Sequence, residues 1–305
     1  MSQFAITGVY SAAATPLNAD YSPDLGLFAA HCKHLIADGC HGIALLGTTG
    51  EANSFSIGER KTILESALKS GLTADQLMPG TGLASVPDTI ELTRHALSLG
   101  VTKVVMLPPF YYKGVTDEGL FAAYAQIIEG VKDDRLKVIL YHIPQMSGVP
   151  LTLGLIEKLI KAFPNTIVGI KDSAGQFDNM QAMVSAFPGF SVLAGADPLL
   201  LPLIKAGGAG CITATSNLVA RSLRTVFEHC ADASKAAEVE TAQARIMAYR
   251  TLSNDYTQIP AIKAMVGLQS KIPSWSRVRA PMLALDEAKL ADLAAKFAAL
   301  EAIHG

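Results

Sequence analysis

Short apolar runs alternate with amphipathic stretches along most of the chain. Runs of this length are typical of strands that are buried on both faces of a sheet. Their carboxyl ends lie about 20 to 35 residues apart, near the length of one strand and the helix that follows it. The sequence therefore predicts eight strands, near residues 6–14, 42–47, 76–80, 103–107, 137–141, 166–171, 190–195 and 210–213.

The segments between the runs have the periodicity of amphipathic helices. Leu92, Ala96 and Leu99 fall at positions i, i+4 and i+7, which places them on one face of a helix. Buried strands that alternate with helices indicate the α/β class. We expect a (β/α)8 TIM barrel, because an open doubly wound sheet would show a glycine fingerprint after its first strand and Ala14-Thr15-Pro16-Leu17 has none.

The chain after Thr213 is rich in Ala and Leu, and it predicts more helices than the one that closes a barrel. No low-complexity linker separates this part from the rest. We therefore expect a single domain with an appendage. The barrel would span residues 1–220, and a C-terminal helical extension over 221–305 would pack on the barrel or on a neighbouring subunit.

Composition narrows the possible classes of function. The 305 residues are 50% hydrophobic, which is enough to bury a sizeable core. Lys plus Arg number 25 against 27 Asp plus Glu, without a basic cluster that would attract nucleic-acid phosphates. No apolar run approaches about 18 residues, and Met1-Ser2-Gln3-Phe4 does not begin a secretion signal. We expect a cytoplasmic protein that binds neither nucleic acid nor membrane.

The cysteines do not predict a metal site. Cys32, Cys40, Cys211 and Cys230 lack CxxC spacing, and no histidine pattern lies beside them. They are typical of small buried hydrophobic side chains rather than of metal ligands or disulfides.

A single lysine closes the sixth apolar run. Lys171 follows Ile167-Val168-Gly169-Ile170, so its amine is expected where the strand leaves the core. A low dielectric disfavours an ammonium ion, and a neutral amine can attack a ketone as a Schiff-base nucleophile. Lysines at strand ends also commonly extend their charge into solvent, so the position alone leaves both interpretations open.

Other strand ends are polar as well, and in a barrel the active site is built at these carboxyl ends. Gly47-Thr48-Thr49-Gly50-Glu51 offers hydroxyls and backbone N–H groups to a small carboxylate, or is a turn with Thr caps. Tyr141 can shuttle protons, or serve in packing only. The small residues of Gly208 to Asn217 allow close approach of a ligand, or of a helix. Tyr111 and Tyr112 lie in the loop after the fourth run, as exposed residues or a subunit contact.

Four motifs, in their order and at their intervals, resemble the dihydrodipicolinate synthase and N-acetylneuraminate lyase superfamily. They are Gly47-Thr48-Thr49-Gly50-Glu51, Tyr141-His142-Ile143-Pro144, Gly169-Ile170-Lys171-Asp172-Ser173 and the loop from Gly208 to Asn217. The resemblance covers almost the whole chain. It implies a barrel with a helical extension, a homotetramer built as a dimer of dimers, and a lyase that uses no metal or organic cofactor.

The resemblance also implies catalytic roles. Lys171 would form an imine with the keto group of pyruvate or of a 2-keto acid, and the protonated imine would act as an electron sink. Tyr141 would carry protons to and from the reacting oxygen, relayed through Thr48 to a tyrosine of the adjacent subunit. That tyrosine corresponds to Tyr111, and Tyr112 stays possible because the loop is one residue longer than in the synthases.

Further residues would bind the substrate. Gly47 and Thr49, together with Thr48, would hold the pyruvyl carboxylate, and Ile212 would present its carbonyl near the lysine. The synthases carry an arginine for the carboxylate of aspartate semialdehyde where this chain has Met146. A thioether cannot make the bidentate charge-assisted hydrogen bonds of arginine, which favours the sugar-acid branch of the superfamily.

In that branch the acceptor is a hydroxylated aldehyde. Ser173, Thr213, Asp197 and Asn217 offer polar groups that could bind its hydroxyls. The same residue types also cap helices, and Asp197 could simply begin the helix after Gly195.

We therefore expect a pyruvate-dependent class I lyase that cleaves or forms a 2-keto-3-deoxy sugar acid or a related 4-hydroxy-2-oxo acid, with pyruvate and an aldehyde as its partners. One alternative is dihydrodipicolinate synthase itself, with the arginine replaced from elsewhere. Another is a hydratase-aldolase or dehydratase that acts through the same imine. A pyruvate-binding protein without turnover is disfavoured, because binding a carboxylate needs neither an imine nor a proton relay.

Overall fold

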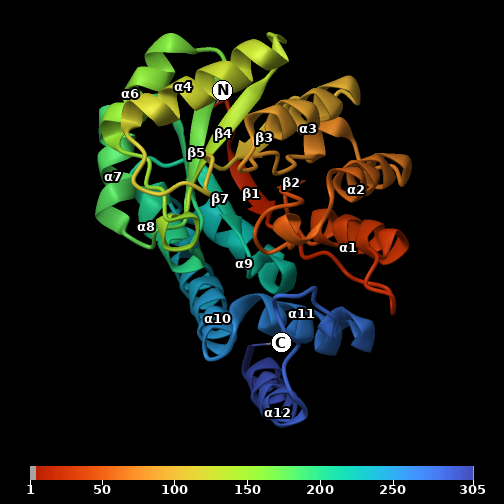
Figure 1. The fold of residues 1–305 in the computed structure, drawn as a ribbon. Coiled ribbons are helices and arrows are strands. Elements are labelled where there is room, and N and C mark those ends of the chain that lie inside the picture. The colour runs from red at the N-terminus through yellow and green to blue at the C-terminus, as the bar shows by residue number, and fades with distance from the viewer. Residues whose placement is uncertain (1–4, 305) are drawn as a thin grey trace.

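The computed structural model describes residues 5–304. Its strands are parallel and form one sheet in the order β2-β1-β7-β6-β5-β4-β3 (Figure 1). Each strand coincides with one of the apolar runs of the sequence. The strands are β1 (Gly8–Ser11), β2 (Gly42–Ile43), β3 (Lys103–Met106), β4 (Lys137–His142), β5 (Ile167–Asp172), β6 (Ser191–Ala194) and β7 (Gly210–Thr213).

The remaining apolar run closes the sheet between its two edges. Leu77 forms a parallel bridge with Ile43, the last residue of β2, and Gly80 forms one with Val105 of β3. Pro79 lies in the middle of this segment and has no N–H to donate, but Met78 and Gly80 donate to the carbonyls of Ile43 and Leu45, and Val105 donates to the Pro79 carbonyl. The predicted barrel is confirmed, with 77–80 as its eighth wall segment.

Helices surround the barrel, and most begin at a side-chain cap that the sequence supplies. Ser56 and Glu59 form a capping box at the start of α2, while Asp24, Ser85 and Thr152 cap α1, α3 and α6. The helices of the barrel are α1 (Leu25–Ala37), α2 (Ile57–Lys69), α3 (Val86–Ser98), α4 (Asp117–Val131), α5 (Pro144–Ser147), α6 (Leu153–Ala162), α7 (Phe177–Ala186), α8 (Leu200–Lys205) and α9 (Ser216–His229).

Side chains of the strands alternate between two apolar clusters, as the period of a strand requires. The outer cluster lies between strands and helices and includes Ile170. The next residue of β5, Lys171, therefore points into the barrel. The inner cluster fills the barrel and contains, among others, Tyr10, Ala44, Met78, Val105, Ile139, Tyr141, Val168, Leu193 and Ile212.

The C-terminal helices α10 (Ala236–Asn254), α11 (Gln258–Ser270) and α12 (Glu287–His304) gather on one side of the barrel (Figure 1). Helix α9 crosses residue 220, the expected boundary, and packs against both β1 and α10. Ion pairs fasten the extension to segments that follow strand ends. These pairs are Lys263 with Glu51, Arg250 with Asp197, and Arg279 with Glu59.

The helices within residues 5–304 are too short or too polar to cross a lipid bilayer.

Candidate active site

Lys171 lies inside the barrel and is 5% exposed. It faces Tyr141 directly, because the two residues are register partners on β5 and β4. The Lys171 Nζ atom lies 4.3 Å from the centroid of the Tyr141 ring. The amine is therefore buried against an aromatic face at the carboxyl ends of the strands, and does not extend into solvent as an exposed lysine would.

Tyr141 is joined to the turn after β2 by a hydrogen bond. Its hydroxyl lies 3.2 Å from the Thr48 hydroxyl. Burial opposes ionisation of the phenol, but the charge of Lys171 and the polar groups of Thr48, Lys171 and Ser173 around the hydroxyl together outweigh burial and lower the pKa of Tyr141 below its usual value. A phenol that ionises more readily than usual is suited to proton transfer at this position.

The turn that carries Thr48 is held in an uncommon backbone conformation. It begins after Leu46 (φ +56°) and ends at Glu51 (φ +57°), two residues other than glycine in the left-handed region. A Cβ atom at Gly80 would overlap the carbonyl oxygen of Leu46, so the neighbouring wall segment must pass close to the turn. Such strain persists only where the surrounding structure fixes the backbone, and it is typical of ligand sites.

The same turn presents free hydrogen-bond donors. The backbone N–H groups of Thr48 and Thr49 have no intramolecular acceptor within residues 5–304, while the Thr48 carbonyl accepts from Glu51 N–H at 3.0 Å. Because buried backbone donors are nearly always paired, free N–H groups beside two hydroxyls indicate a seat for an anion.

The exposed candidate residues lie around the opening at the carboxyl ends of the strands, which we call the mouth of the barrel. Met146, on the short helix α5, is 62% exposed, and Tyr111 and Tyr112 are each 73% exposed. The two tyrosine rings meet edge to face, with centroids 5.2 Å apart. Within residues 5–304, neither of their hydroxyls bonds to Thr48 or Tyr141 of the same chain.

Four further residues were expected to bind the substrate. Ile212 belongs to the inner cluster, and Ser173 lies two residues after Lys171, just past the end of β5, where its carbonyl accepts from Gln145. Thr213 is fully buried, and its hydroxyl has no partner within residues 5–304. Asp197 begins the 3-10 helix η3 (Asp197–Leu199), and its carboxylate accepts from Arg250 of α10 at 3.3 Å, so it faces the extension.

Asn217 is occupied by the fold. Its Oδ1 accepts from Ala14 N–H at 3.0 Å and lies 2.9 Å from His31 Nε2. Its Nδ2 donates to the carbonyls of Ala12 and Ala214 at 2.9 and 2.7 Å. These bonds use both amide protons, so the side chain fastens β1 to α9 and has no donor left for a substrate hydroxyl.

Arg60 is a residue that sequence reasoning missed. It is 2% exposed, and its Nη2 donates to the carbonyl of Gly80 at 2.8 Å. Its Nε and Nη1 atoms have no partner within residues 5–304, and burial lowers the pKa of its guanidinium to about 10. Together with Thr48 and Tyr141 it lines a cavity of about 20 Å³. Its spacing from Ile63 and Leu64 on the apolar face of α2 could have revealed it.

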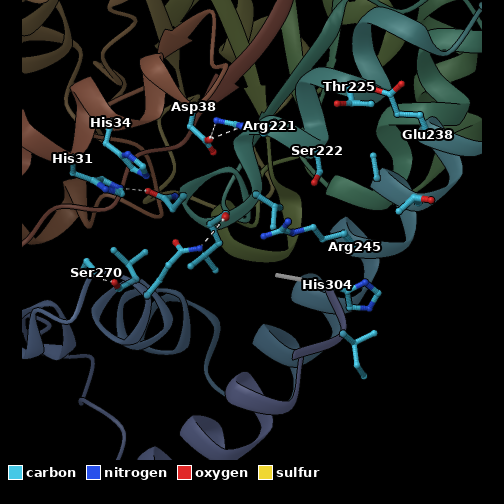
Figure 2. A pocket seen from close by; sticks show the side chains of 18 of the residues that line it. His31, His34, Asp38, Arg221, Ser222, Thr225, Glu238, Arg245, Ser270 and His304 are labelled. Atoms are coloured by element: carbon cyan, nitrogen blue, oxygen red, sulfur yellow. Dashed lines mark hydrogen bonds and ion pairs between the residues drawn. The ribbon is translucent and has the colours of Figure 1, made fainter. Parts of the chain in front are cut away.

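A much larger cavity, about 1110 Å³, lies away from Lys171. It opens between α1, α9, α10 and α11 and the end of α12, and Figure 2 shows His31 and His34 on one side of it and Arg245 and His304 on the other. Volume alone does not identify a reacting site. The buried amine beside Tyr141 and Thr48 does so on chemistry, and it places the candidate active site inside the barrel.

Comparison with known proteins agrees with this geometry. The model of the dihydrodipicolinate synthetase family matches residues 5–300. The chain belongs to this family. It is 34% identical over 291 residues to a DapA-like lyase of Chloroflexus aurantiacus, covering 95% of each chain. It is also 34% identical over 215 residues to the 4-hydroxy-tetrahydrodipicolinate synthase of Rhizobium meliloti. That match covers 70% of the present chain and 71% of the synthase.

Solved structures of the family have the same fold. YagE, a prophage protein from E. coli K12 of this family solved in complex with pyruvate, superposes with a TM-score of 0.88 at 28% identity, over 97% of this chain and 98% of its own. The dihydrodipicolinate synthase from Agrobacterium tumefaciens gives 0.87 at 27% identity, over 96% and 99%. The resemblance drawn from the four motifs is confirmed, and so is the assignment to the lyases of this family.

Proposed function

We propose that this member of the dihydrodipicolinate synthetase family is a pyruvate-dependent class I lyase that cleaves or forms a 2-keto-3-deoxy sugar acid, or a related 4-hydroxy-2-oxo acid. The observation that carries the proposal is the buried amine of Lys171 against the Tyr141 ring, whose hydroxyl bonds to Thr48. Carbon–carbon cleavage next to a ketone needs an amine nucleophile and a proton carrier in contact, and this arrangement provides both.

The chemistry follows from this contact. The neutral Lys171 amine adds to the keto carbon, and loss of water leaves a protonated imine. When the C3–C4 bond breaks, its electron pair moves into the imine as an enamine, and Tyr141 takes the proton of the C4 hydroxyl while an aldehyde leaves. Protonation at C3 and hydrolysis then release pyruvate and restore the amine. Condensation runs the same steps in reverse.

The carboxylate of the keto acid fits the turn after β2. The free N–H groups of Thr48 and Thr49, next to Gly47, support this role. YagE, which was solved in complex with pyruvate, is a relative that binds a keto acid of this kind, and this supports the assignment. Ile212, from the inner cluster, would place its carbonyl on the opposite side of the bound keto group.

The other substrate distinguishes the two leading candidates. The curated relatives include several 4-hydroxy-tetrahydrodipicolinate synthases, which favours aspartate semialdehyde. Met146 at the mouth has no charge to hold the carboxylate of that substrate, which favours an uncharged, hydroxylated aldehyde instead. Ser173 and Thr213 would bind its hydroxyls, and Asp197 would do so if it exchanged Arg250 for the substrate.

A direct comparison of substrates tests the proposal. We expect pyruvate release from a panel of 2-keto-3-deoxy sugar acids, measured with a coupled dehydrogenase, and at least about a hundredfold lower kcat/KM for condensation of pyruvate with aspartate semialdehyde, since an unpaired substrate carboxylate forfeits its charge-assisted bonds. Faster turnover of aspartate semialdehyde than of any sugar acid would contradict the assignment and establish the synthase activity.

We also propose that the active site is completed by Tyr111 of the partner subunit, within a homotetramer. Both tyrosines of the loop after β3 are exposed in the single chain, and a second copy would bury them. Tyr111→Phe should lower kcat about a hundredfold because it removes one hydroxyl of the proton relay, while Tyr112→Phe should change kcat less than about threefold.

Steady-state kinetics of the two variants check this assignment. Each variant is measured at a concentration at which its sedimentation shows the same assembly as wild type. The reverse order of effects would make Tyr112 the relay residue. Full activity in a monomer verified by sedimentation would exclude a relay between subunits.

A further inference from the structure

A buried ion pair joins the extension to the turn after β2. The side chains of Glu51 and Lys263 are both 0% exposed, and the Lys263 ammonium donates to Glu51 Oε1. The second oxygen, Oε2, accepts from the backbone N–H of Arg279 at 2.8 Å. Both oxygens of this carboxylate are therefore held by the C-terminal extension, and none of these contacts reaches the barrel interior.

Glu51 is the last residue of the strained turn. Its φ of +57° is one that an L-residue adopts at a cost, so something outside the turn must hold it there. Its N–H donates to the Thr48 carbonyl at 3.0 Å, which links the conformation at Glu51 to the orientation of the Thr48 and Thr49 peptide groups. A shift of the Glu51 side chain would thus turn the free N–H groups away from a bound carboxylate.

Stability alone does not call for charges at this position. Burying an ion pair removes both groups from water, and well-packed apolar residues of the same volume commonly stabilise a fold as well or better. What a carboxylate held at two oxygens adds is a fixed direction, because each acceptor position is occupied by a donor from a different segment of the extension. This combination is suited to setting a backbone geometry.

We propose that Glu51 and Lys263 are positioning residues for substrate binding, and that the C-terminal extension through them holds the Thr48–Thr49 seat in its binding conformation. The inference rests on the proposed function only in taking the bound group to be the carboxylate of a 2-keto acid. Lys171, which forms the imine, belongs to β5, whereas the turn follows β2, so the pair should act on carboxylate binding and on the contact of Thr48 with Tyr141, and leave the rate of imine formation at saturating pyruvate largely unchanged.

The test compares Lys263→Met with the double variant Glu51→Gln/Lys263→Met. The single variant leaves a buried carboxylate without its counter-ion and can simply unfold, whereas the double variant removes both charges and keeps the volume. The matched control is Tyr249→Phe, which deletes the partly buried hydrogen bond from Tyr249 to Glu301 inside the extension and touches no residue of the turn. Thermal unfolding measures the loss of stability for each.

The first readout is borohydride trapping of pyruvate. In the double variant we expect the pyruvate concentration for half-maximal trapping to rise about 10- to 100-fold, as expected for a misplaced binding group, while the trapping rate at saturation stays within about threefold of wild type. Tyr249→Phe should lower the unfolding temperature and leave half-saturation unchanged. A double variant with lowered unfolding temperature and wild-type half-saturation would show that the pair is structural only.

The second readout separates this inference from the proposed function. If wild-type protein is not trapped by pyruvate, the lyase mechanism fails, and the seat is then examined by calorimetric titration with pyruvate in a Lys171→Ala background, where no imine can form. Weaker binding of pyruvate when Glu51→Gln/Lys263→Met is added supports the positioning role. Equal pyruvate affinity of Lys171→Ala with and without Glu51→Gln/Lys263→Met overturns it.

Discussion

Replacing Lys171 with alanine is expected to abolish the covalent trapping of pyruvate by borohydride and to lower keto-acid cleavage at least about a thousandfold, because a nucleophile that forms the covalent intermediate has no substitute. Its amine is buried against Tyr141, and the other buried lysine of the described residues, Lys263, is paired with Glu51. Intact-protein and peptide mass spectrometry should find a reduced pyruvyl adduct on Lys171 in wild type and none in the variant.

Lys161→Ala is the matched control. This lysine is exposed on α6 and pairs only with Glu157, so its loss should leave trapping and turnover unchanged. An adduct on a different lysine in both proteins would refute the assignment of Lys171. A folded wild-type protein without any adduct would remove the lyase mechanism and leave a binding protein on a barrel.

The sequence predicted the barrel because its strands are short, apolar and evenly spaced. Every run coincides with a wall segment, including 77–80, which contains Pro79 and pairs with its neighbours through isolated bridges. A run keeps its apolar pattern even where one donor is lost, so periodicity found a segment that regular pairing does not define. The residue at which the extension begins was less predictable, since α9 packs on both β1 and α10 and its composition does not distinguish it from the barrel helices.

The residues of the candidate site were likewise predictable only in part. Lys171, Tyr141 and Thr48 stand where apolar runs end, and parallel strands bring such ends together, so their proximity follows from the fold. Glu51 and Lys263 form an ion pair across 212 positions of the sequence, and no local sequence pattern predicts it. Asn217 was expected to offer a polar group that could bind substrate hydroxyls, or to cap a helix, and its amide joins the segment after β1 to α9.

The hydroxyl of Tyr141 is expected to contribute next most after the amine of Lys171. Tyr141→Phe should lower kcat/KM about 100- to 1000-fold, the usual contribution of a positioned proton carrier, and should keep the ring that packs against Lys171. Tyr124→Phe is the matched control, since Tyr124 is also buried and its hydroxyl donates to the Met106 carbonyl at 3.4 Å, away from Lys171 and Thr48. Equal losses in the two variants would show that a buried hydroxyl, rather than proton transfer, is responsible.

The pH dependence of turnover gives a second, independent measure of the same role. In the cleavage direction Tyr141 takes the proton of the C4 hydroxyl only as a phenolate, so kcat/KM for cleavage should rise with pH through the pKa of Tyr141 and level off above it. Because the charge of Lys171 and the polar groups of Thr48 and Ser173 outweigh burial and lower the pKa of Tyr141, that rise should begin at a lower pH than for an ordinary tyrosine. Thr48→Val removes one group that favours the phenolate, so the rise should move to higher pH, and in Tyr141→Phe it should be absent. A rise that persists unchanged in Tyr141→Phe would assign the titration to another group and with it the proton transfer.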